Sequence, residues 1–368
     1  MDALNDFARF LIEQGKMELS LPVHAQVLTW VEAHQPDDVR QRLLAQNNFG
    51  NALKNSGHYE RAKQVFEQSV SLCDLHGHEL RLEKAATENY LARLLRDQGE
   101  FVQAKALLQN ALTLREQVLG TDHLEVAATL NDLAFLDKEL GEYDSAEKTY
   151  RRALALRQQQ LGDDHLETAI TTNNLAILLE LAGKYGESEQ LQKNALQVFL
   201  KHRGNHHPDT AAALSNLASL LRFRGDYEQA ESLYRQALSI YDEGHGWGVH
   251  LHTAHTLQGL AQLLSDKAVF KEAETHYKRS LNIRLQILGK NHPILAQNLH
   301  GMAGLYIDQG RFKEAEKFLH HALKLRQQGL GEAHPLTAYT LFTLANFYSD
   351  FGDYEKAKPF YERALEIR

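Results

Sequence analysis

A glycine-aromatic-alanine signature returns at a fixed interval along most of the 368-residue chain. In its full form, a glycine is followed two positions later by an aromatic residue and three positions after that by an alanine, as in Gly57, Tyr59 and Ala62. The copies begin at positions 57, 99, 141, 183, 225, 268, 310 and 352, which are 42 residues apart except for one interval of 43. Ala268 replaces the glycine of the sixth copy, and Ser188 replaces the alanine of the fourth. Such a period predicts one structural unit stacked many times.

A second signature keeps the same phase. Leu-Gly-x-x-His, followed four residues later by alanine, begins at positions 119, 161, 288 and 330, and a variant spans residues 203–208. Each copy of either signature precedes an apolar pattern of helical period, such as Leu130, Leu133 and Ala134. We therefore predict that each unit is a pair of amphipathic helices joined by short turns. No alternating β-branched pattern is present, so the expected fold class is all-α.

Small and aromatic residues recur at fixed places within these predicted helices. The turn glycine lies where a helix C-terminus favours a residue that tolerates positive φ. Small side chains let neighbouring helices approach closely, and aromatic side chains fill the space between units. One hairpin cannot bury its own apolar face, so we expect the units to stack into a continuous core. The small residues of the first helices are Ala134, Ala176, Ala218, Ala261, Ala303 and Ala345, and the aromatic residues are Phe66, Tyr150, Tyr234, Tyr277 and Tyr361.

The pattern resembles the tetratricopeptide repeat over essentially the whole chain. The 42-residue period, the Leu-Gly-x-x-His signature and the segment Asn173-Asn174-Leu175-Ala176 resemble the kinesin light chain subclass. The resemblance implies a right-handed superhelical solenoid of helix-turn-helix repeats. It also implies that the first helix of each repeat lines a concave groove, in which the family binds extended or helical peptides.

The repeats predict the domain organisation. Residues 43–368 form eight 42-residue repeats in one continuous solenoid, and residues 1–42 are expected to be a degenerate N-terminal capping repeat, with Gly15 at the turn position and Ala8 at the small position. Pro22 fits near the start of the second helix of this repeat, behind Ser20 as N-cap. The chain stops at Arg368 without a polar capping helix, so we expect either a longer natural chain or a partner that covers this end.

Composition excludes several classes of function. The net charge of −8 and a pI near 6.2 disfavour nucleic acid, which needs a basic surface. No apolar run approaches the roughly 20 residues of a membrane span, and the start of the chain lacks a secretory signal. A single cysteine, Cys73, excludes an internal disulfide framework and indicates a reducing, cytoplasmic compartment. This thiol is expected to be buried and inert in the apolar tail of a second helix.

No constellation for catalysis or for a cofactor is present. The chain lacks a glycine-rich phosphate loop, a Gly-x-Ser-x-Gly elbow and a His-Glu-x-x-His motif. Most of the 20 histidines recur at the turn before a first helix and are expected to be turn or cap elements. The exception is the segment His245–His255, where the extra residue of the 43-residue interval lies. We expect an irregular loop there rather than a metal site, because no cysteine is near.

The predicted groove column is the position three residues before the small residue of each first helix. Carboxamides there can donate to and accept from a peptide backbone without selecting a side chain. The alternative is an ordinary solvated polar face, copied by repeat duplication. The column contains Asn47, Asn89, Asn131, Asn173, Ser215, Gln258, His300 and Phe342, and the neighbouring Asn51, Asn174 and Asn216 complete the carboxamide set of the predicted site.

Charged residues flank this column. The predicted groove contains Lys54, Arg93, Arg96, Lys138 and Arg222 in its first five repeats, together with Asp97, Glu139 and Glu180. The last three repeats have Asp266, Asp308 and Asp350 and no lysine or arginine in the same columns. This shift predicts a ligand with an acidic segment toward the N-terminal half. The alternative is a mixed, solvated surface.

These observations predict a non-catalytic protein-protein interaction scaffold that binds a peptide or protein segment in the concave groove. The resemblance to kinesin light chain implies a cargo-adaptor-like use. As an alternative, the family resemblance implies the ligand-sensing segment of a larger signalling NTPase or caspase-like protease, whose effector domain lies outside this chain. A further hypothesis is self-association through the uncapped C-terminal end, around Phe360, Tyr361 and Leu365.

Overall fold

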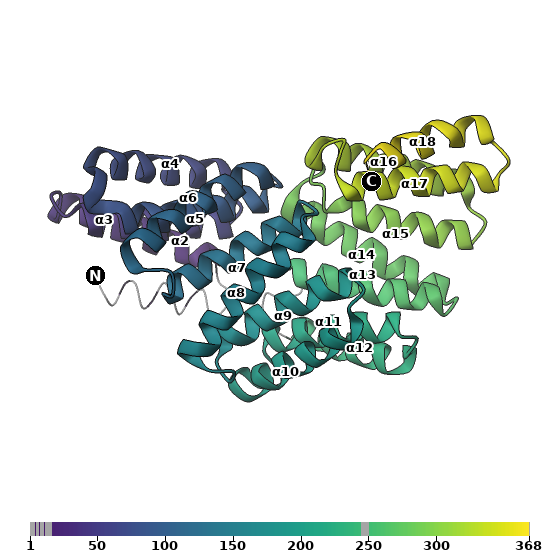
Figure 1. Ribbon diagram of the computed structural model, residues 1–368, viewed down its shortest axis with the longest axis horizontal. Helices are drawn as coiled ribbons and strands as arrows, with labels where there is room; N and C mark the ends of the chain where they lie inside the picture. Colours follow the sequence, from purple (N-terminus) through teal and green to yellow (C-terminus); the bar gives the residue numbers. More distant parts are fainter. Residues whose placement is uncertain (1–3, 5–6, 8–10, 12–16, 244–249, 368) are drawn as a thin grey trace. The chain divides into compact units, whose positions relative to one another are not determined.

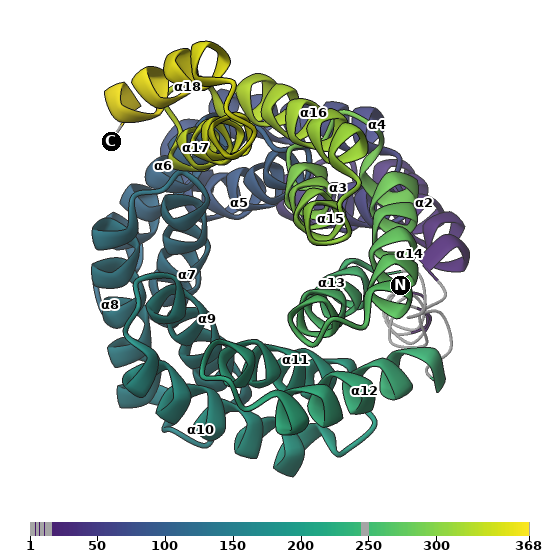
Figure 2. The same ribbon diagram turned by 90° about the vertical axis from the view of Figure 1, so that its right-hand side faces the viewer.

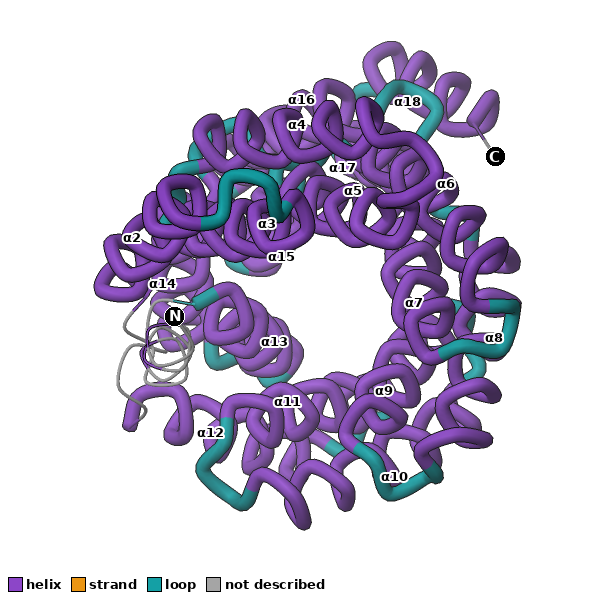
Figure 3. The backbone as a smooth tube through the Cα atoms, turned by 90° about the vertical axis from the view of Figure 1, so that its left-hand side faces the viewer, coloured by secondary structure: helices purple, strands orange, loops and turns teal. Residues whose placement is uncertain are grey.

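The computed structural model describes Leu4, Phe7, Leu11 and residues 17–243 and 250–367. All regular structure in these residues is helical, and none of them forms a strand (Figures 1 and 3). The helices are α2 (Met17–His34), α3 (Val39–Asn55), α4 (Tyr59–His76), the 3-10 helix η1 (Gly77–Leu80), α5 (Arg81–Asp97), α6 (Phe101–Leu119), α7 (Leu124–Glu139), α8 (Tyr143–Leu161), α9 (Leu166–Leu181), α10 (Tyr185–Arg203), α11 (Pro208–Phe223), α12 (Tyr227–Glu243), α13 (Leu251–Asp266), α14 (Phe270–Leu288), α15 (Leu295–Asp308), α16 (Phe312–Leu330), α17 (Pro335–Asp350) and α18 (Tyr354–Ile367).

The chain divides into two compact units. Unit 1 comprises Met1–Asp137 and Asp144–Asp163, and unit 2 comprises Lys138–Tyr143 and Asp164–Arg368. From α3 on, each odd-numbered helix is the first helix of a pair and each even-numbered helix is the second. Within unit 2, α9, α11, α13, α15 and α17 form one layer, and their partners α10 to α18 form the other (Figure 2). The predicted solenoid of helix pairs is confirmed.

Histidine side chains cap the first helices. The Nδ1 atom of the periodic histidine before each of six first helices accepts a hydrogen bond from the backbone N–H two residues later, at 3.1–3.3 Å. A side-chain acceptor at this place satisfies one of the free N–H groups at a helix start. The expected turn or cap role of the periodic histidines is therefore observed. The six capping residues are His123, His165, His207, His250, His292 and His334.

Glycine at the turn between first and second helices has positive φ, as in Gly225 at 84° and Gly310 at 72°. Ala268 occupies the same place between α13 and α14 with a φ of 59°, and no other non-glycine residue among those described has positive φ. An L-residue pays a steric penalty in this region, because its Cβ approaches the backbone too closely. The turn is therefore strained at the one repeat that lacks glycine.

Ala268→Gly is expected to stabilise the protein by about 0.5–1 kcal/mol, since relief of the strain outweighs the backbone entropy of glycine. The reciprocal change, Gly310→Ala, is expected to destabilise by a similar amount, although a Cβ at Gly310 would meet no atom within 4 Å. Urea unfolding monitored by circular dichroism would measure both shifts. Equal midpoints for Ala268→Gly and the wild type would contradict the assignment of strain.

The buried layer between first and second helices consists of the predicted small and aromatic residues. Ala176, Ala218 and Ala303 are fully buried, and Tyr234 and Tyr277 are 1% and 2% exposed. The aromatic rings lie against residues without a side chain on the next first helix. A Cβ built on Gly259 would lie 2.5 Å from the Tyr234 hydroxyl, and one on Gly301 would lie 2.7 Å from Tyr277. These glycines are required by the close approach of the helices.

The N-terminal segment differs from its prediction in one detail. Pro22 lies inside α2, which begins at Met17, and Ser20 is a buried residue of that helix rather than its N-cap. The expectation that the helix begins after Ser20 was wrong, because a proline within the first turns of a helix removes few backbone hydrogen bonds and is tolerated there. Ala8 and Gly15 of the predicted capping repeat lie outside the described residues.

Candidate functional site

In unit 1, the predicted groove column lies mostly in the interior. Asn47, Asn89 and Asn131 are 5%, 7% and 9% exposed, and Asn51, one turn after Asn47, is half-buried. The Nδ2 atom of Asn47 donates a hydrogen bond to Thr87 Oγ1 on the next first helix at 3.0 Å. Oδ1 of Asn47 and Nδ2 of Asn89 have no partner among the described residues. The column therefore links neighbouring helices, and its role in binding a ligand stays a prediction.

The column continues in unit 2 with similar pairing. Asn216 Nδ2 donates to Asn173 Oδ1 at 3.0 Å, and Thr256 Oγ1 donates to Ser215 Oγ at 3.0 Å. Ser215 is buried, whereas Asn173, Asn174 and Asn216 are half-buried. In this unit, the carboxamides of the predicted site that reach the surface are therefore those of Asn173, Asn174 and Asn216.

The predicted basic residues of unit 1 are paired with carboxylates of the protein itself. Lys54 Nζ lies 3.0 Å and Arg96 Nη2 lies 2.8 Å from the Asp97 carboxylate, and Arg93 Nη2 lies 2.8 Å from Asp132. Burial by itself would raise the pKa of Asp97, but the charges of Arg96 and Lys54 lower it. Lys54 and Arg93 thus link consecutive first helices, and an acidic ligand would compete with the internal carboxylates for all three cations.

The two remaining predicted cations are also paired. Arg222 Nη1 lies 2.7 Å from Asp266 on the next first helix, and Lys138 forms an ion pair with Glu139. Asp308 accepts a hydrogen bond from Ser265 at 3.4 Å, and Asp308 and Asp350 form no ion pair with the residues described. An acidic ligand segment toward the N-terminal half stays a prediction.

A different column of the first helices is open to solvent. It lies six residues before the small residue, and its members are exposed in the first and the last three repeats and half-buried in the four repeats between them. Leu44 is 54% exposed at one end and Tyr339 is 49% exposed at the other. No polar residue repeats there, so periodicity did not single out this column in the sequence. The column contains Leu44, Ala86, Ala128, Ile170, Ala212, His255, Gln297 and Tyr339.

Aromatic side chains gather on α15, α17 and α18 within unit 2. The rings of His300 and Tyr339 are 4.9 Å apart, and His300 Nε2 lies 3.1 Å from Thr343 Oγ1. Burial, assisted by the charge of Arg326, lowers the pKa of His300 to about 4. His300 is therefore neutral at pH 7. With Phe342, which is 36% exposed, these residues form a neutral aromatic part of the first-helix layer.

The second helices carry a column of buried arginines that sequence reasoning missed. Arg115, Arg157, Arg284 and Arg326 are between 3% and 7% exposed. Arg115 and Arg326 each donate to a threonine hydroxyl fourteen residues later on the following first helix. Their spacing by the repeat period was a visible signal, but buried arginine is rare enough that periodicity alone does not predict it.

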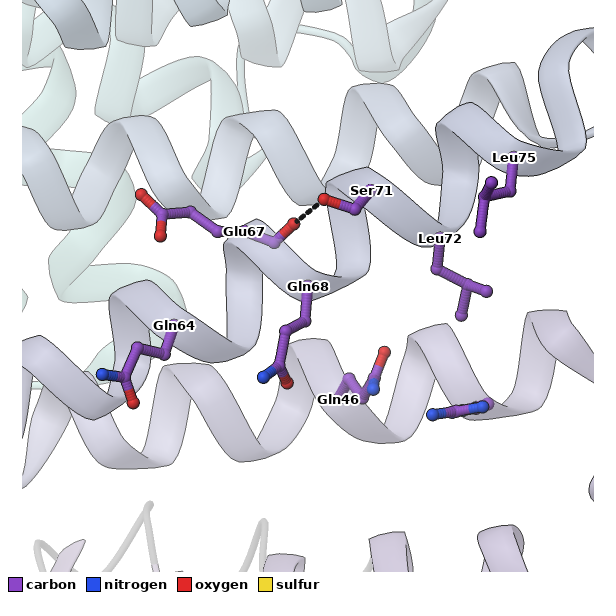
Figure 4. A pocket seen from close by; sticks show the side chains of 8 residues that line it. Gln46, Gln64, Glu67, Gln68, Ser71, Leu72 and Leu75 are labelled. Atoms are coloured by element: carbon purple, nitrogen blue, oxygen red, sulfur yellow. Dashed lines mark hydrogen bonds between the residues drawn. The ribbon is translucent and has the colours of Figure 1, made fainter.

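A surface pocket of about 620 Å³ lies between α3 and α4 (Figure 4). Six of its eight lining residues are polar or charged, and Leu75 at its rim is 84% exposed. Ser71 Oγ donates to the backbone carbonyl of Glu67 at 2.9 Å, so its hydroxyl is engaged locally. The lining contains no histidine or cysteine that could act as a base or nucleophile. Gln46, Gln64, Gln68 and Leu72 complete the labelled wall of the pocket.

The described residues supply no other chemical centre. No group of three or more His, Cys, Asp or Glu side chains among them could hold a metal ion, and residues 244–249 of the His-rich segment lie outside the description. Cys73 is buried, and burial raises the pKa of its thiol to about 11, which makes it unreactive near neutral pH. None of the described helices is both long enough and apolar enough to cross a bilayer.

Stacked helix pairs with a 42-residue period, histidine caps and a small-residue layer define a helical repeat protein. Models of the tetratricopeptide repeat match residues 83–159, 125–193, 167–243, 252–319 and 295–368, and another matches residues 44–74. The chain belongs to the tetratricopeptide repeat family, as its sequence predicted.

Solved structures that resemble the chain are distant from it in sequence. A Rap protein complexed with competence and sporulation factor is 16% identical, with a TM-score of 0.70 over 99% of this chain and 96% of its own. The Rap conjugation gene regulator of plasmid pLS20, in complex with the Phr* peptide, is 14% identical, with a TM-score of 0.63 over 94% of each chain. A putative kinesin light chain from Podosopora anserina with nearly identical repeats is 21% identical, with a TM-score of 0.46 over 54% of this chain and 94% of its own. No curated protein matches the sequence.

Proposed function

We propose that this chain is a non-catalytic interaction scaffold that binds a peptide or protein segment along its first-helix layer, in the cytoplasm. The observation that carries the proposal is the open column, whose members are exposed at Leu44 in unit 1 and at His255, Gln297 and Tyr339 on three consecutive first helices of unit 2. Single exposed residues are common, but exposed side chains at the same place of three consecutive repeats form a continuous surface that a partner can cover. Two structures of the same fold, the Rap proteins, were determined with a factor or peptide bound.

Polar residues beside this column supply a way to hold a peptide backbone. Asn51 in unit 1 and Asn216 in unit 2 are half-buried, and their carboxamides can donate and accept at the surface. The exposed column would contact the side chains of the ligand and would therefore determine specificity. Both the column and the neighbouring carboxamides would contribute to affinity. The alternative function, a ligand-sensing segment of a larger signalling protein, would use the same surface. Self-association through α18 stays a separate prediction, and Leu365 on that helix is 76% exposed.

A charge placed on the open column is expected to abolish partner binding. Leu44→Glu with Tyr339→Glu should weaken binding at least tenfold, because an interface that covers these side chains would bury an unpaired carboxylate. Partners would be captured from native lysate on the immobilised chain, identified by mass spectrometry and titrated against each variant.

The matched control places two glutamates at exposed apolar positions on second helices. Leu75→Glu with Val102→Glu changes side chains that are 84% and 72% exposed on α4 and α6. These changes should leave both affinity and helicity unchanged. The proposal is wrong if the control pair reduces binding as strongly as the first-helix pair, or if the first-helix pair binds every captured partner normally.

A further inference from the structure

The turns from first to second helices form one edge of unit 2, and each of these turns carries an exposed apolar side chain. The turns join α9 to α10, α11 to α12, α13 to α14, α15 to α16 and α17 to α18. Single exposed hydrophobic residues need no explanation, but a contiguous set of them indicates an interaction surface. The set includes Tyr185, Phe223, Val269, Phe312, Phe351 and Tyr354, which are between 40% and 68% exposed.

The opposite edge of unit 2, made by the turns from second to first helices, has a different character. Leu161, Leu288 and Leu330 of its Leu-Gly turns are half-buried. The exposed residues of the same turns include the acidic Asp163 and Glu332. Exposure of large apolar side chains is therefore a property of one edge in the described part of this unit, and not of its turns in general.

Aromatic pairs link neighbouring turns along the apolar edge. The ring centroids of Tyr185 and Phe223 are 6.2 Å apart in a stacked pair, and those of Phe312 and Phe351 are 4.5 Å apart in an edge-to-face pair. The ring of Phe351 also lies 4.9 Å from that of Phe347, which is buried in α17. These exposed rings are held in place within the free protein, so a partner that covers them pays little for ordering them.

Charged residues at the same edge show a pairing rule. A cation near the end of one first helix neutralises a carboxylate at the end of the next. Lys54 Nζ lies 3.0 Å from Asp97 in unit 1, and Arg222 Nη1 lies 2.7 Å from Asp266 in unit 2. The guanidinium of Arg222 also lies over the ring of Phe223, 4.5 Å from its centroid. One repeat thus holds a cation that contacts both a carboxylate and an aromatic ring.

The last two repeats keep the carboxylate and lack the cation. Asp308 and Asp350 stand at the position of Asp266, whereas Ser265 and Ile307 stand at the position of the cation. Both of these aspartates are exposed. Asp308 accepts a long hydrogen bond of 3.4 Å from Ser265, and Asp350 has no hydrogen bond or ion pair with the residues that the structure describes. The edge therefore has two places where a cation from outside the chain would complete the pairing rule.

Charge also decides between the possible occupants of this edge. A second copy of the chain in a symmetric contact would bring its own Asp308 and Asp350 to the interface. Nucleic acid and an anionic membrane surface would likewise bring negative charge. Like charges across an interface are unfavourable, whereas opposite charges favour and orient association. A basic segment of another protein is the occupant that supplies the missing charge.

We propose that this edge is a docking surface for a protein partner whose contact segment combines basic and apolar side chains. Lysine or arginine side chains of the segment pair with Asp308 and Asp350. Its apolar side chains cover Phe312, Phe351 and Tyr354. The aromatic rings beside the two carboxylates strengthen the contact with the partner's cations, because a ring face attracts positive charge.

The edge is distinct from the open column. Tyr339 of the open column lies in the second turn of α17, whereas Asp350 is the last residue of that helix. At 1.5 Å per residue the two positions are about 16 Å apart along the helix axis. The inference therefore does not rest on the proposed function, and each of the two surfaces can be altered without the other.

A library of random displayed peptides, selected on the intact chain, tests the proposal. We expect a class of peptides rich in both basic and apolar residues, which Asp308→Lys with Asp350→Lys binds at least about tenfold more weakly than the wild type. Glutamate in place of the basic residues of such a peptide should restore its binding to the charge-reversed variant. The affinity of the wild type for these peptides should also fall as salt is added.

The aromatic part of the surface is tested separately. Tyr354→Ser removes a ring that is 68% exposed, so it should weaken binding of the same peptides severalfold while its melting temperature stays near that of the wild type. The matched control, Asp163→Lys with Glu332→Lys, makes the same charge reversals on the opposite edge and should bind these peptides normally. Leu44→Glu with Tyr339→Glu, which alters the open column, should also bind them normally.

The inference is overturned if the selection yields no peptide that depends on Asp308 and Asp350, or if the dependent peptides contain no basic residue. It is also overturned if light scattering shows a dimer that the charge-reversed variant does not form, because the edge would then bind a second copy. Failure of the proposed function has another signature, namely normal binding of every captured partner by Leu44→Glu with Tyr339→Glu.

Discussion

Gly301→Ala is expected to destabilise the protein by about 1–3 kcal/mol, because a methyl group has no room there. The added Cβ would lie 2.7 Å from both Cε1 and the hydroxyl of Tyr277, whose ring is 2% exposed and enclosed by the core of unit 2. Either α15 must move away from α14 or the ring must leave its rotamer. Both changes disturb the contact on which stacking of the next repeat depends.

Gly304, three residues later on the same helix, supplies the control. A Cβ at Gly304 would meet no atom within 4 Å. Gly304→Ala should therefore stabilise α15 by up to about 1 kcal/mol through the higher helix propensity of alanine. Chemical unfolding of the two variants should give midpoint shifts of opposite sign. If Gly301→Ala also stabilises the protein, helix propensity rather than packing governs this helix.

A loss of stability is expected as the pH falls from about 6.5 to about 4, because the first helices are capped by unprotonated histidines. Each cap uses Nδ1 as an acceptor, so a protonated ring cannot make the bond, and its charge is unfavourable at the positive end of the helix dipole. Burial lowers the pKa of His207, with Arg203 adding to the effect and Asp209 opposing it. Burial and the neighbouring His252 lower the pKa of His250 to about 4.

The sign follows from proton binding. A histidine whose pKa is lower in the folded state binds more protons after unfolding, so its contribution is fully present above pH 6.5 and is lost as the pH falls through the folded pKa. For His250 alone this loss approaches about 3 kcal/mol. His207→Asn with His250→Asn keeps a capping side chain that does not titrate, and should flatten the decline in urea midpoint between pH 7 and pH 4.5.

His321→Asn is the matched control for that experiment. His321 is exposed within α16 and is not one of the six capping histidines. The pH dependence of this variant should equal that of the wild type. A double variant at His207 and His250 that declines as steeply as the wild type would show that other groups dominate acid unfolding.

Much of the fold followed from the sequence because its causes are local or strictly periodic. The turn glycines, the small residues at Ala176 and Ala303, and the histidines of the Leu-Gly-x-x-His turns each have a role within one hairpin or between adjacent hairpins. A position that repeats every 42 residues meets the same environment in each repeat. Element type, helix pairing and the buried layer could therefore be predicted.

The candidate site was predicted less well, because the direction of a side chain depends on its packing. The predicted column included Asn47 and Asn89, which are largely buried, whereas the open column begins three residues earlier on the same helix, at Leu44. On a helix, residues three apart point in directions that differ by about 60°, so a displacement of one column is enough to move from the edge of the interior to the surface. The polar character of asparagine suggested exposure, but a hydrogen bond to Thr87 satisfies it inside.

The sequence by itself determined the repeat, the all-helical class and the family, since period and helix propensity are properties of the chain alone. Only the tertiary structure decided how the charges are used. Lys54 pairs with Asp97, 43 residues away, and Arg222 pairs with Asp266, 44 residues away. Which cation finds a carboxylate, and that Arg284 finds none, depends on how consecutive helices pack, because ion pairs form between atoms that are close in space rather than at a fixed separation in the chain.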